Sequence, residues 1–150
     1  MQNAALLRKN AANGEDRGEA AGEGTQRRMR LLIIDDHASF LDALAKMLEQ
    51  EPAVEVVGRA KDGRQGLETA AELKPDVVIV DFAMPELDGI GVTRALRKWP
   101  QPPKIIMMSF HAEPEYRDMA LAAGADAFLT KTNLYKELVP LMARLGKEAG

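Results

Sequence analysis

Polar residues of complementary chemistry stand where the apolar runs of this sequence end. Asp35 and Asp36 follow one run directly, Asp81 ends a second, and Ser109 and Lys131 follow two others. Carboxylates that meet in one crevice repel one another unless protons or a cation intervene, and hard oxygen ligands with room for water suit Mg²⁺. A hydroxyl and an ammonium at the same place could bind phosphoryl oxygens. The set therefore suits a phosphoryl group carried on a carboxylate.

Ordinary structural roles would explain each of these residues taken singly. An Asp at the end of a strand often forms a turn, the Asp35-Asp36 pair could cap a helix, and Lys131 could be a solvated lysine. His37 and His111 also lie close to the crevice in sequence, where solvated loop imidazoles are the favoured interpretation. The joint placement of the acidic, hydroxyl and ammonium groups at strand ends favours a functional site.

Five apolar segments are predicted to be the strands that position these groups. They are residues 31–34, 54–57, 77–80, 105–108 and 127–130. Runs 31–34, 77–80 and 105–108 are continuously apolar, which is typical of strands buried on both faces, whereas 54–57 and 127–130 are mixed and suit sheet edges. Gly58 and Gly63 are expected to open a turn after the second strand.

Each strand is followed by a segment with helical spacing of apolar residues. Leu41, Leu44 and Leu48 predict the first helix, with Ser39 as its cap. Leu67, Ala70 and Ala71 predict the buried face of the second, with Leu73 as a further candidate. A third helix is expected over about 89–98, a fourth from Pro114 to Gly124, and a last one capped by Asn133 with Leu134, Leu138, Leu141 and Leu145 inward.

A repeated strand–helix unit predicts an α/β fold with right-handed crossovers. The three apolar interior strands and two mixed edge strands fit a flavodoxin-like, doubly wound five-stranded parallel sheet of order 2-1-3-4-5, with helices on both faces. In that order the first and third strands are neighbours at the topological switch point. Asp35, Asp36 and Asp81 would meet there, and Ser109 and Lys131 would reach the same edge.

The composition excludes several other classes of function. The 150 residues contain no Cys, so disulfides and thiolate sites are absent, and the net charge of −3 without a basic block argues against a nucleic-acid surface. No apolar run is long enough for a membrane span, and a cytoplasmic location is expected. Residues 1–28 have only Leu6 and Leu7 as large aliphatic residues and are predicted to be a flexible extension, with a partner-binding arm as the alternative.

From residue 31 to residue 146 the sequence resembles the receiver domain of bacterial response regulators. The matching features are Asp35-Asp36, Asp81 with Met84-Pro85 and Asp88-Gly89, Ser109, and Phe128-Leu129-Thr130-Lys131. Asp35-Asp36-His37 and Lys131-Thr132 look like receivers that elsewhere carry helix-turn-helix output domains. A receiver domain over residues 29–147 is therefore expected, without an output domain, and a stand-alone receiver is slightly favoured over a fragment.

The resemblance implies a phosphoprotein of two-component signalling or a phosphorelay. Asp81 would accept the phosphoryl group from a phosphohistidine of a sensor histidine kinase or histidine phosphotransfer protein. Mg²⁺ would be held by Asp35, Asp36, Asp81 and the backbone carbonyl of Ala83. Ser109 and Lys131 would bind the phosphoryl group, and Ser109 with Phe128 would form the switch pair.

The implied output is a changed surface for a downstream protein on the fourth helix, fifth strand and fifth helix, with no direct nucleic-acid or membrane binding. A phosphorylation-dependent homodimer is also allowed. Such a protein would catalyse its own phosphorylation and slow hydrolysis without being a turnover enzyme. Ala83 and His111 are the residues expected to influence the hydrolysis rate, because His111 could orient a water and Ala83 has no polar side chain.

Three other functions compete with this interpretation. A haloacid-dehalogenase-type hydrolase needs a second acid two residues after its nucleophile, and Ala83 occupies that position. A flavin-binding protein needs a hydroxyl- and Gly-rich phosphate loop after the first strand, where Asp35-Asp36-His37 would repel the phosphate. A receiver-like interaction module that works without phosphorylation remains the main alternative.

Overall fold

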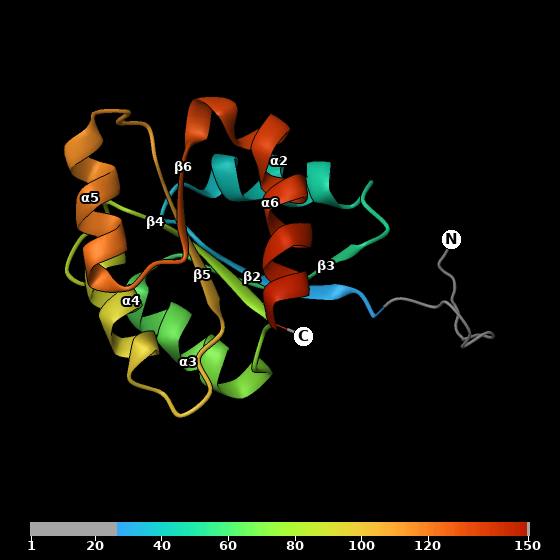
Figure 1. The fold of residues 1–150 in the computed structure, drawn as a ribbon, viewed down its shortest axis with the longest axis horizontal. Helices are drawn as coiled ribbons and strands as arrows, with labels where there is room; N and C mark the ends of the chain where they lie inside the picture. The colour runs from blue at the N-terminus through green and yellow to red at the C-terminus, as the bar shows by residue number, and fades with distance from the viewer. Residues whose placement is uncertain (1–26, 150) are drawn as a thin grey trace.

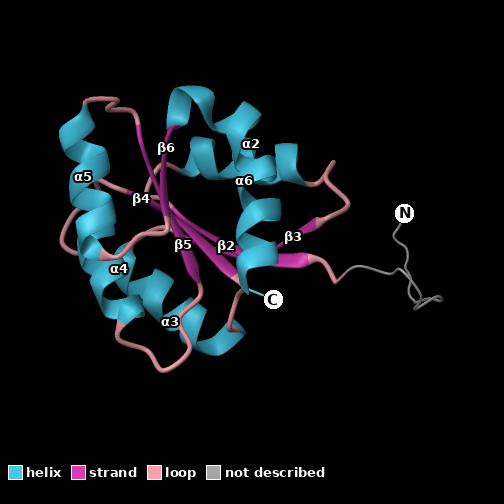
Figure 2. Cartoon of the chain, in the orientation of Figure 1, coloured by secondary structure: helices cyan, strands magenta, loops and turns pink. Residues whose placement is uncertain are grey.

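A computed structural model of the protein describes residues 27–149, in which five β-strands alternate with five α-helices (Figures 1 and 2). The strands are β2 (Met29–Ile34), β3 (Val54–Ala60), β4 (Val77–Asp81), β5 (Lys104–Ser109) and β6 (Ala127–Thr130). The α-helices are α2 (Ala38–Leu48), α3 (Gly63–Leu73), α4 (Gly89–Arg97), α5 (Pro114–Ala123) and α6 (Leu134–Ala149), and a short 3₁₀ helix, η1 (Lys131–Asn133), precedes α6.

The strands form one parallel sheet of order β3-β2-β4-β5-β6. This is the predicted order 2-1-3-4-5, with β2 and β4 as neighbours at the topological switch point. The flavodoxin-like α/β fold predicted from the sequence is therefore confirmed. Of the predicted extension over residues 1–28, residues 1–26 lie outside the part of the chain that the structure describes.

The sheet is covered on both faces, as the continuous apolar strands require (Figure 1). In β2, Leu31 and Ile33 pack into the core beneath α2 and α6, whereas Leu32 and Ile34 pack into the core beneath α3, α4 and α5. Successive side chains of a strand point to opposite faces, so a run of four apolar residues contributes to both cores. None of the helices in residues 27–149 combines the length and apolar content that a bilayer crossing requires.

The second strand is longer than expected, and the predicted turn at Gly58 is wrong. Strand β3 continues to Ala60, and its pairing with β2 passes from Val56 directly to Gly58. A Cβ built on Gly58 would lie 2.8 Å from the Leu73 side chain of α3. The glycine allows close packing of a helix on the strand, which a turn signal in the sequence cannot distinguish from chain reversal.

The predicted buried face of α3 is wrong at Ala71, which is exposed. Ala70 is buried and Leu67 partly buried, as predicted, and the other buried positions of the helix are Gly63 and Gly66. A Cβ on Gly66 would overlap the Ile34 side chain, so the closest approach of helix and sheet depends on glycines. Apolar periodicity gives no weight to glycine, which has no side chain. It therefore included the exposed Ala71 in the buried face and missed the two buried glycines.

The predicted cap of the first helix is also wrong. Helix α2 begins at Ala38, and its N-cap is His37, whose side chain makes no capping hydrogen bond. Ser39 is thus already inside the helix. The Asp35 carboxylate accepts a hydrogen bond from the backbone N–H of His37 at 2.9 Å and stabilises this turn in place of a serine cap.

Candidate functional site

The carboxyl edge of the sheet brings the predicted polar residues together. Asp35 follows β2, Asp81 ends β4, Ser109 ends β5 and Lys131 follows β6. Their relative exposures are 0% for Asp35, 4% for Asp81 and 3% for both Ser109 and Lys131. Burying such groups is costly unless they pair with one another or with a ligand, so this cluster is more than a solvated loop surface.

Lys131 links the two central carboxylates. Its Nζ lies 2.7 Å from Asp35 Oδ2 and 3.2 Å from Asp81 Oδ1, and its side chain is almost completely buried. The alternative of an ordinary solvated lysine is therefore excluded. One ammonium faces two carboxylates, with Asp36 beside them, so the site has an excess of negative charge that favours cations.

The same crowding raises the pKa of Asp81 to about 6. Burial is the largest cause, the Asp35 carboxylate adds to it, and Lys131 opposes it. Because the charged form of Asp81 is disfavoured, a cation that neutralises its negative charge would be bound favourably here.

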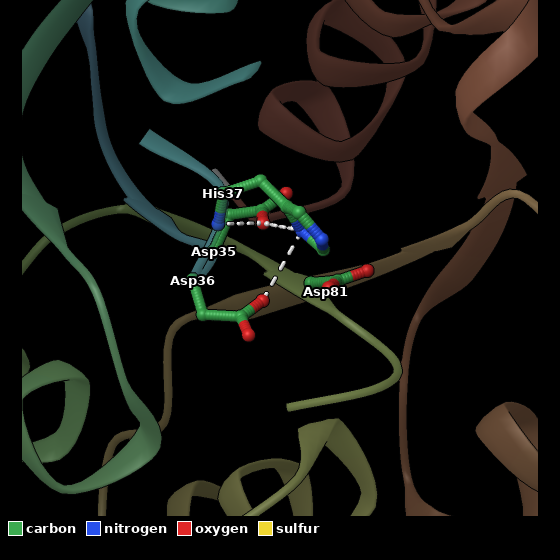
Figure 3. A group of neighbouring side chains, drawn as sticks. All are labelled: Asp35, Asp36, His37 and Asp81. Carbon is green, nitrogen blue, oxygen red and sulfur yellow. Dashed lines mark hydrogen bonds and ion pairs between the residues drawn. The ribbon is translucent and has the colours of Figure 1, made fainter. Parts of the chain in front are cut away.

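Asp36 and His37 complete an acidic rim around Asp81 (Figure 3). His37 Nδ1 lies 3.1 Å from Asp35 Oδ1 and 3.2 Å from Asp36 Oδ1, although 61% of its side chain remains exposed. The sequence interpretation favoured a solvated loop imidazole for His37. The structure instead places the ring against both carboxylates, and the direct adjacency of His37 to the acidic pair is the signal that could have indicated this.

The donor set of this rim fits a divalent cation. Asp35, Asp36, His37 and Asp81 each offer a ligand atom, and these atoms lie within 4.8 Å of one another. Carboxylate oxygens are the ligands that Mg²⁺ prefers, and a partly exposed rim leaves room for the waters that this ion retains. Ala83 lies two residues after Asp81, in an exposed position of the loop that follows β4.

Ser109 and Phe128 occupy adjacent strands. Ser109 pairs with Thr130 in the β5–β6 register, and its Oγ accepts a hydrogen bond from the backbone N–H of His111 at 3.0 Å. The hydroxyl hydrogen therefore stays available for another acceptor. The Phe128 side chain is buried and belongs to the core beneath α3, α4 and α5, with Tyr116 packed against that core.

His111 lies in the loop that follows β5, beside an aromatic side chain. Its ring stacks on Tyr116, with centroids 4.6 Å apart and an angle of 10° between the planes, and its Nδ1 lies 3.6 Å from a Glu113 carboxylate oxygen. The Tyr116 ring in turn contacts Phe82, the residue after Asp81. This arrangement holds the imidazole close to the loop that follows β4.

Two functional-site neighbours escaped the sequence interpretation. The rings of Phe40 and Phe110 lie 4.3 and 4.9 Å from Lys131 Nζ. Neither ring is assigned to the site from the sequence alone. No local pattern indicates that both would meet a lysine from another loop.

Comparison with known proteins gives a consistent result. The family model for the response regulator receiver domain matches residues 31–143. The transcriptional regulatory protein LiaR of Bacillus subtilis is 35% identical over 119 residues, covering 79% of this chain and 56% of LiaR. A protein-glutamate methylesterase/protein-glutamine glutaminase of Symbiobacterium thermophilum is 42% identical over 108 residues, covering 71% of this chain and 30% of the relative.

Solved structures agree with the sequence relatives. The signal receiver domain of the response regulator NarL from Mycobacterium tuberculosis superposes with a TM-score of 0.76 at 34% identity, covering 81% of this chain and 98% of that chain. The chain spans about half the length of LiaR and less than a third of the methylesterase. With the family model covering most of the chain and the same fold in the solved relatives, this chain belongs to the response regulator receiver domain family of two-component signalling.

Proposed function

We propose that this protein is a phosphorylatable switch in which Asp81 accepts a phosphoryl group from a phosphohistidine of a sensor histidine kinase or histidine phosphotransfer protein. The observation that carries this proposal is the buried Asp81 carboxylate, 3.2 Å from the ammonium of Lys131 at the carboxyl edge of the sheet. Residues 29–147 form the receiver domain in this proposal, and residues 1–28 are its amino-terminal extension. A cytoplasmic location fits such a partner.

In the transfer, an Asp81 carboxylate oxygen forms a bond to phosphorus while the bond from phosphorus to the donor imidazole nitrogen breaks. The electron pair of the broken bond stays on the imidazole. Lys131 moves its contact from the Asp81 oxygen to a phosphoryl oxygen, and Ser109 donates its free hydroxyl hydrogen to another. The transfer thereby converts the carboxylate into an acyl phosphate, a mixed anhydride whose phosphoryl oxygens both residues stabilise.

The divalent cation implied by the family is Mg²⁺. Asp35, Asp36, Asp81 and the backbone carbonyl of Ala83 would hold it, and it would neutralise charge on the phosphoryl oxygens. The fit rests on the excess of carboxylates over ammonium groups at this rim and on the closeness of their oxygens. His37 contacts two of these carboxylates and would have to yield space to the ion.

The output would be a change in the surface formed by α5, β6 and α6. Ser109 and Phe128 lie on β5 and β6, so movement of the hydroxyl toward the phosphoryl group frees space beside the aromatic ring. Met119 and Leu121 of α5 are exposed apolar side chains on that surface. We infer that a downstream protein, or a second copy in a phosphorylation-dependent homodimer, docks there.

The alternative is a receiver-like interaction module that works without phosphorylation. The matched methylesterases are enzymes by name, but the alignment covers only 30% of one such protein. We propose that the chemistry of this chain is limited to gaining and losing a phosphoryl group. The completeness of the buried Asp–Lys–Ser set favours the phosphorylated switch over the unphosphorylated module.

The test is phosphorylation by a small donor such as acetyl phosphate with Mg²⁺, followed by intact-mass analysis. The parent protein should gain one phosphoryl group, and Asp81→Asn should gain none. Asp42→Asn is the matched control, because Asp42 is an exposed carboxylate on α2. Equal labelling of the Asp81→Asn protein would refute Asp81 as the acceptor.

A further inference from the structure

The ammonium of Lys131 has carboxylates and aromatic rings as its neighbours. Asp35 and Asp81 lie within ion-pair distance, and the rings of Phe40 and Phe110 lie 4.3 and 4.9 Å from the nitrogen. An ammonium has three N–H donors, and two of them can be used by the carboxylates. The rings therefore occupy space that would otherwise need water or another acceptor.

Burial makes these ring contacts energetically relevant. Only 1% of the Lys131 side chain is exposed, so its charge is removed from bulk water. A cation that faces an aromatic ring is attracted by the negative potential above the ring face, and this attraction increases when the cation is desolvated. The two rings also meet each other edge to face, with centroids 6.2 Å apart and an interplanar angle of 72°.

The exposure of Phe110 is unusual for a residue with only a packing role. It is 65% exposed, so it gains little from removal of apolar area from water. Phe40 differs, because it is half-buried on α2 and packs against the core beneath that helix. The contacts of the Phe110 ring with Lys131 and Phe40 are therefore the structural feature that distinguishes it from other exposed residues.

We propose that Phe40 and Phe110 form an aromatic clamp that holds the Lys131 ammonium in position for phosphoryl transfer to Asp81. The clamp consists of positioning residues, since they act through Lys131. Ring faces impose no fixed hydrogen-bond geometry, so they can retain the ammonium while its contact changes from the Asp81 oxygen to a phosphoryl oxygen. This inference rests on the proposed phosphoryl-acceptor function.

An obstructing role for Phe110 predicts the opposite kinetic effect. If the ring only hindered access to Asp81, a smaller or non-aromatic residue would speed labelling by acetyl phosphate. If the ring positions Lys131, loss of the aromatic face should slow labelling even when apolar bulk is kept. Phe110→Leu separates these roles, because leucine retains bulk without the ring, and Phe110→Tyr retains the ring.

The experiment measures the rate constant of labelling by acetyl phosphate and Mg²⁺ in the parent, Phe110→Leu, Phe110→Tyr and Phe40→Leu proteins. Phe110→Leu should be slower by about 2- to 30-fold, the range expected for loss of one cation–π contact, and Phe110→Tyr should recover most of the rate. Phe40→Leu should show a similar loss if it folds. Tyr135→Leu, at an exposed aromatic residue on α6, is the matched control and should keep the parent rate.

A spectroscopic measurement tests the clamp independently of phosphorylation. Ring currents should displace the Lys131 side-chain proton resonances upfield in the unphosphorylated protein, and Phe110→Leu should reduce this displacement. The resonances are assigned by their loss in Lys131→Met. A Phe110→Leu protein that labels as fast as the parent or faster, or a Lys131 spectrum unchanged by that substitution, would overturn the clamp. A parent protein that shows the ring-current effect but is never labelled would refute the proposed function and leave the clamp standing.

Discussion

Asp81 combines deep burial with a carboxylate neighbour and an ammonium neighbour. Burial and Asp35 raise its pKa to about 6 from an ordinary value of 3.8, while Lys131 limits the rise. The folded protein therefore binds a proton at this position more tightly than the unfolded chain does. At the scale of single residues, the site holds unfavourable negative charge that protonation or cation binding would relieve.

The raised pKa predicts that Asp81 destabilises the fold near neutral pH. Between about pH 4 and pH 6 the Asp81 carboxyl keeps its proton in the folded state but loses it in the unfolded chain. The contribution of Asp81 to the free energy of unfolding is therefore fully present below about pH 4 and is lost as the pH rises through about 6. The loss is at most about 3 kcal/mol, because one pKa unit corresponds to about 1.4 kcal/mol. In the absence of Mg²⁺, Asp81→Asn should therefore be more stable than the parent at pH 7.5, with the gap closing toward pH 4.

Urea unfolding of both proteins at pH 4, 5, 6 and 7.5 measures this difference. Mg²⁺ should stabilise the parent at pH 7.5, because it binds the folded state through the acidic rim, and Asp36→Ala should weaken that effect. If the difference in the free energy of unfolding between the parent and Asp81→Asn stayed constant across the pH series, the pH-dependent loss of stability could not be assigned to Asp81.

His111 is predicted to influence the lifetime of the phosphorylated state. Its ring is held by stacking on Tyr116, and a neutral imidazole nitrogen could orient the water that hydrolyses the acyl phosphate. A fully optimised water-orienting group contributes about 10²–10⁴-fold, and a single exposed imidazole should contribute the low end or less.

The measurement is the phosphate half-life of the parent, His111→Ala and His111→Gln. His111→Ala should decay more slowly, and His111→Gln should recover part of the parent rate, because the amide can also accept a hydrogen bond. Identical decay of the parent and His111→Ala would mean that His111 is only a loop residue.

At the scale of elements, the loop between β4 and α4 is shaped by a close backbone approach. The N–H of Gly89 donates to the Phe82 carbonyl at 2.9 Å, which brings the start of α4 against the end of β4. A Cβ built on Gly89 would overlap the carbonyl oxygen of Asp81 and lie 2.9 Å from the Phe82 Cα. Both neighbours are backbone atoms, so the overlap could be relieved only by a backbone shift that separates the start of α4 from Asp81 and Phe82.

Gly89→Ala is therefore expected to destabilise the protein by about 1–3 kcal/mol and to slow phosphorylation of Asp81. Gly91→Ala is the matched control two residues later in α4. Its Cβ would meet only the end of the flexible Leu87 side chain, and alanine favours the helix by about 0.5–1 kcal/mol. Thermal unfolding and labelling rates of both variants test this, and equal effects at the two positions would contradict a specific role for the Gly89 approach.

At the scale of the whole molecule, the sheet separates two cores that meet opposite faces of the same strands. Both cores are built from residues of the described domain, and the amino-terminal side of that domain is tied by polar contacts. The Arg27 guanidinium donates to Asp76 at 2.9 Å, and Arg28 donates to the Val54 carbonyl at 2.7 Å. These contacts fix Arg27 and Arg28 to the sheet end of the described domain.

Removal of residues 1–26 should leave the thermal midpoint within about 2 °C of the full chain, because this segment offers few large apolar side chains for a core. Removal of residues 1–27 should add a decrease of a few degrees at most, since the Arg27–Asp76 pair is largely exposed on the arginine side. Differential scanning calorimetry compares the three chains. A loss of many degrees on removing 1–26 would show that the segment packs on the domain.

The sequence by itself determined the strand order and the residues that gather at the carboxyl edge. Each interior strand is a short apolar run that ends in a polar group, so Asp35, Asp81 and Ser109 could be assigned to one edge once the repeated strand–helix unit was recognised. Helix faces were less accessible to this reasoning. The buried positions of α3 include Gly63 and Gly66, and glycine contributes nothing to apolar periodicity.

Only the tertiary structure decided which side chains touch within that edge. Phe110 contacts Lys131, which follows a different strand, and His37 contacts the two carboxylates that precede it. The Asp81 carboxylate is buried among groups from several strand ends. Periodicity records which face of an element a residue occupies. Contacts between loops depend instead on how the strands are ordered and how closely the helices pack on them, which is a property of the assembled fold.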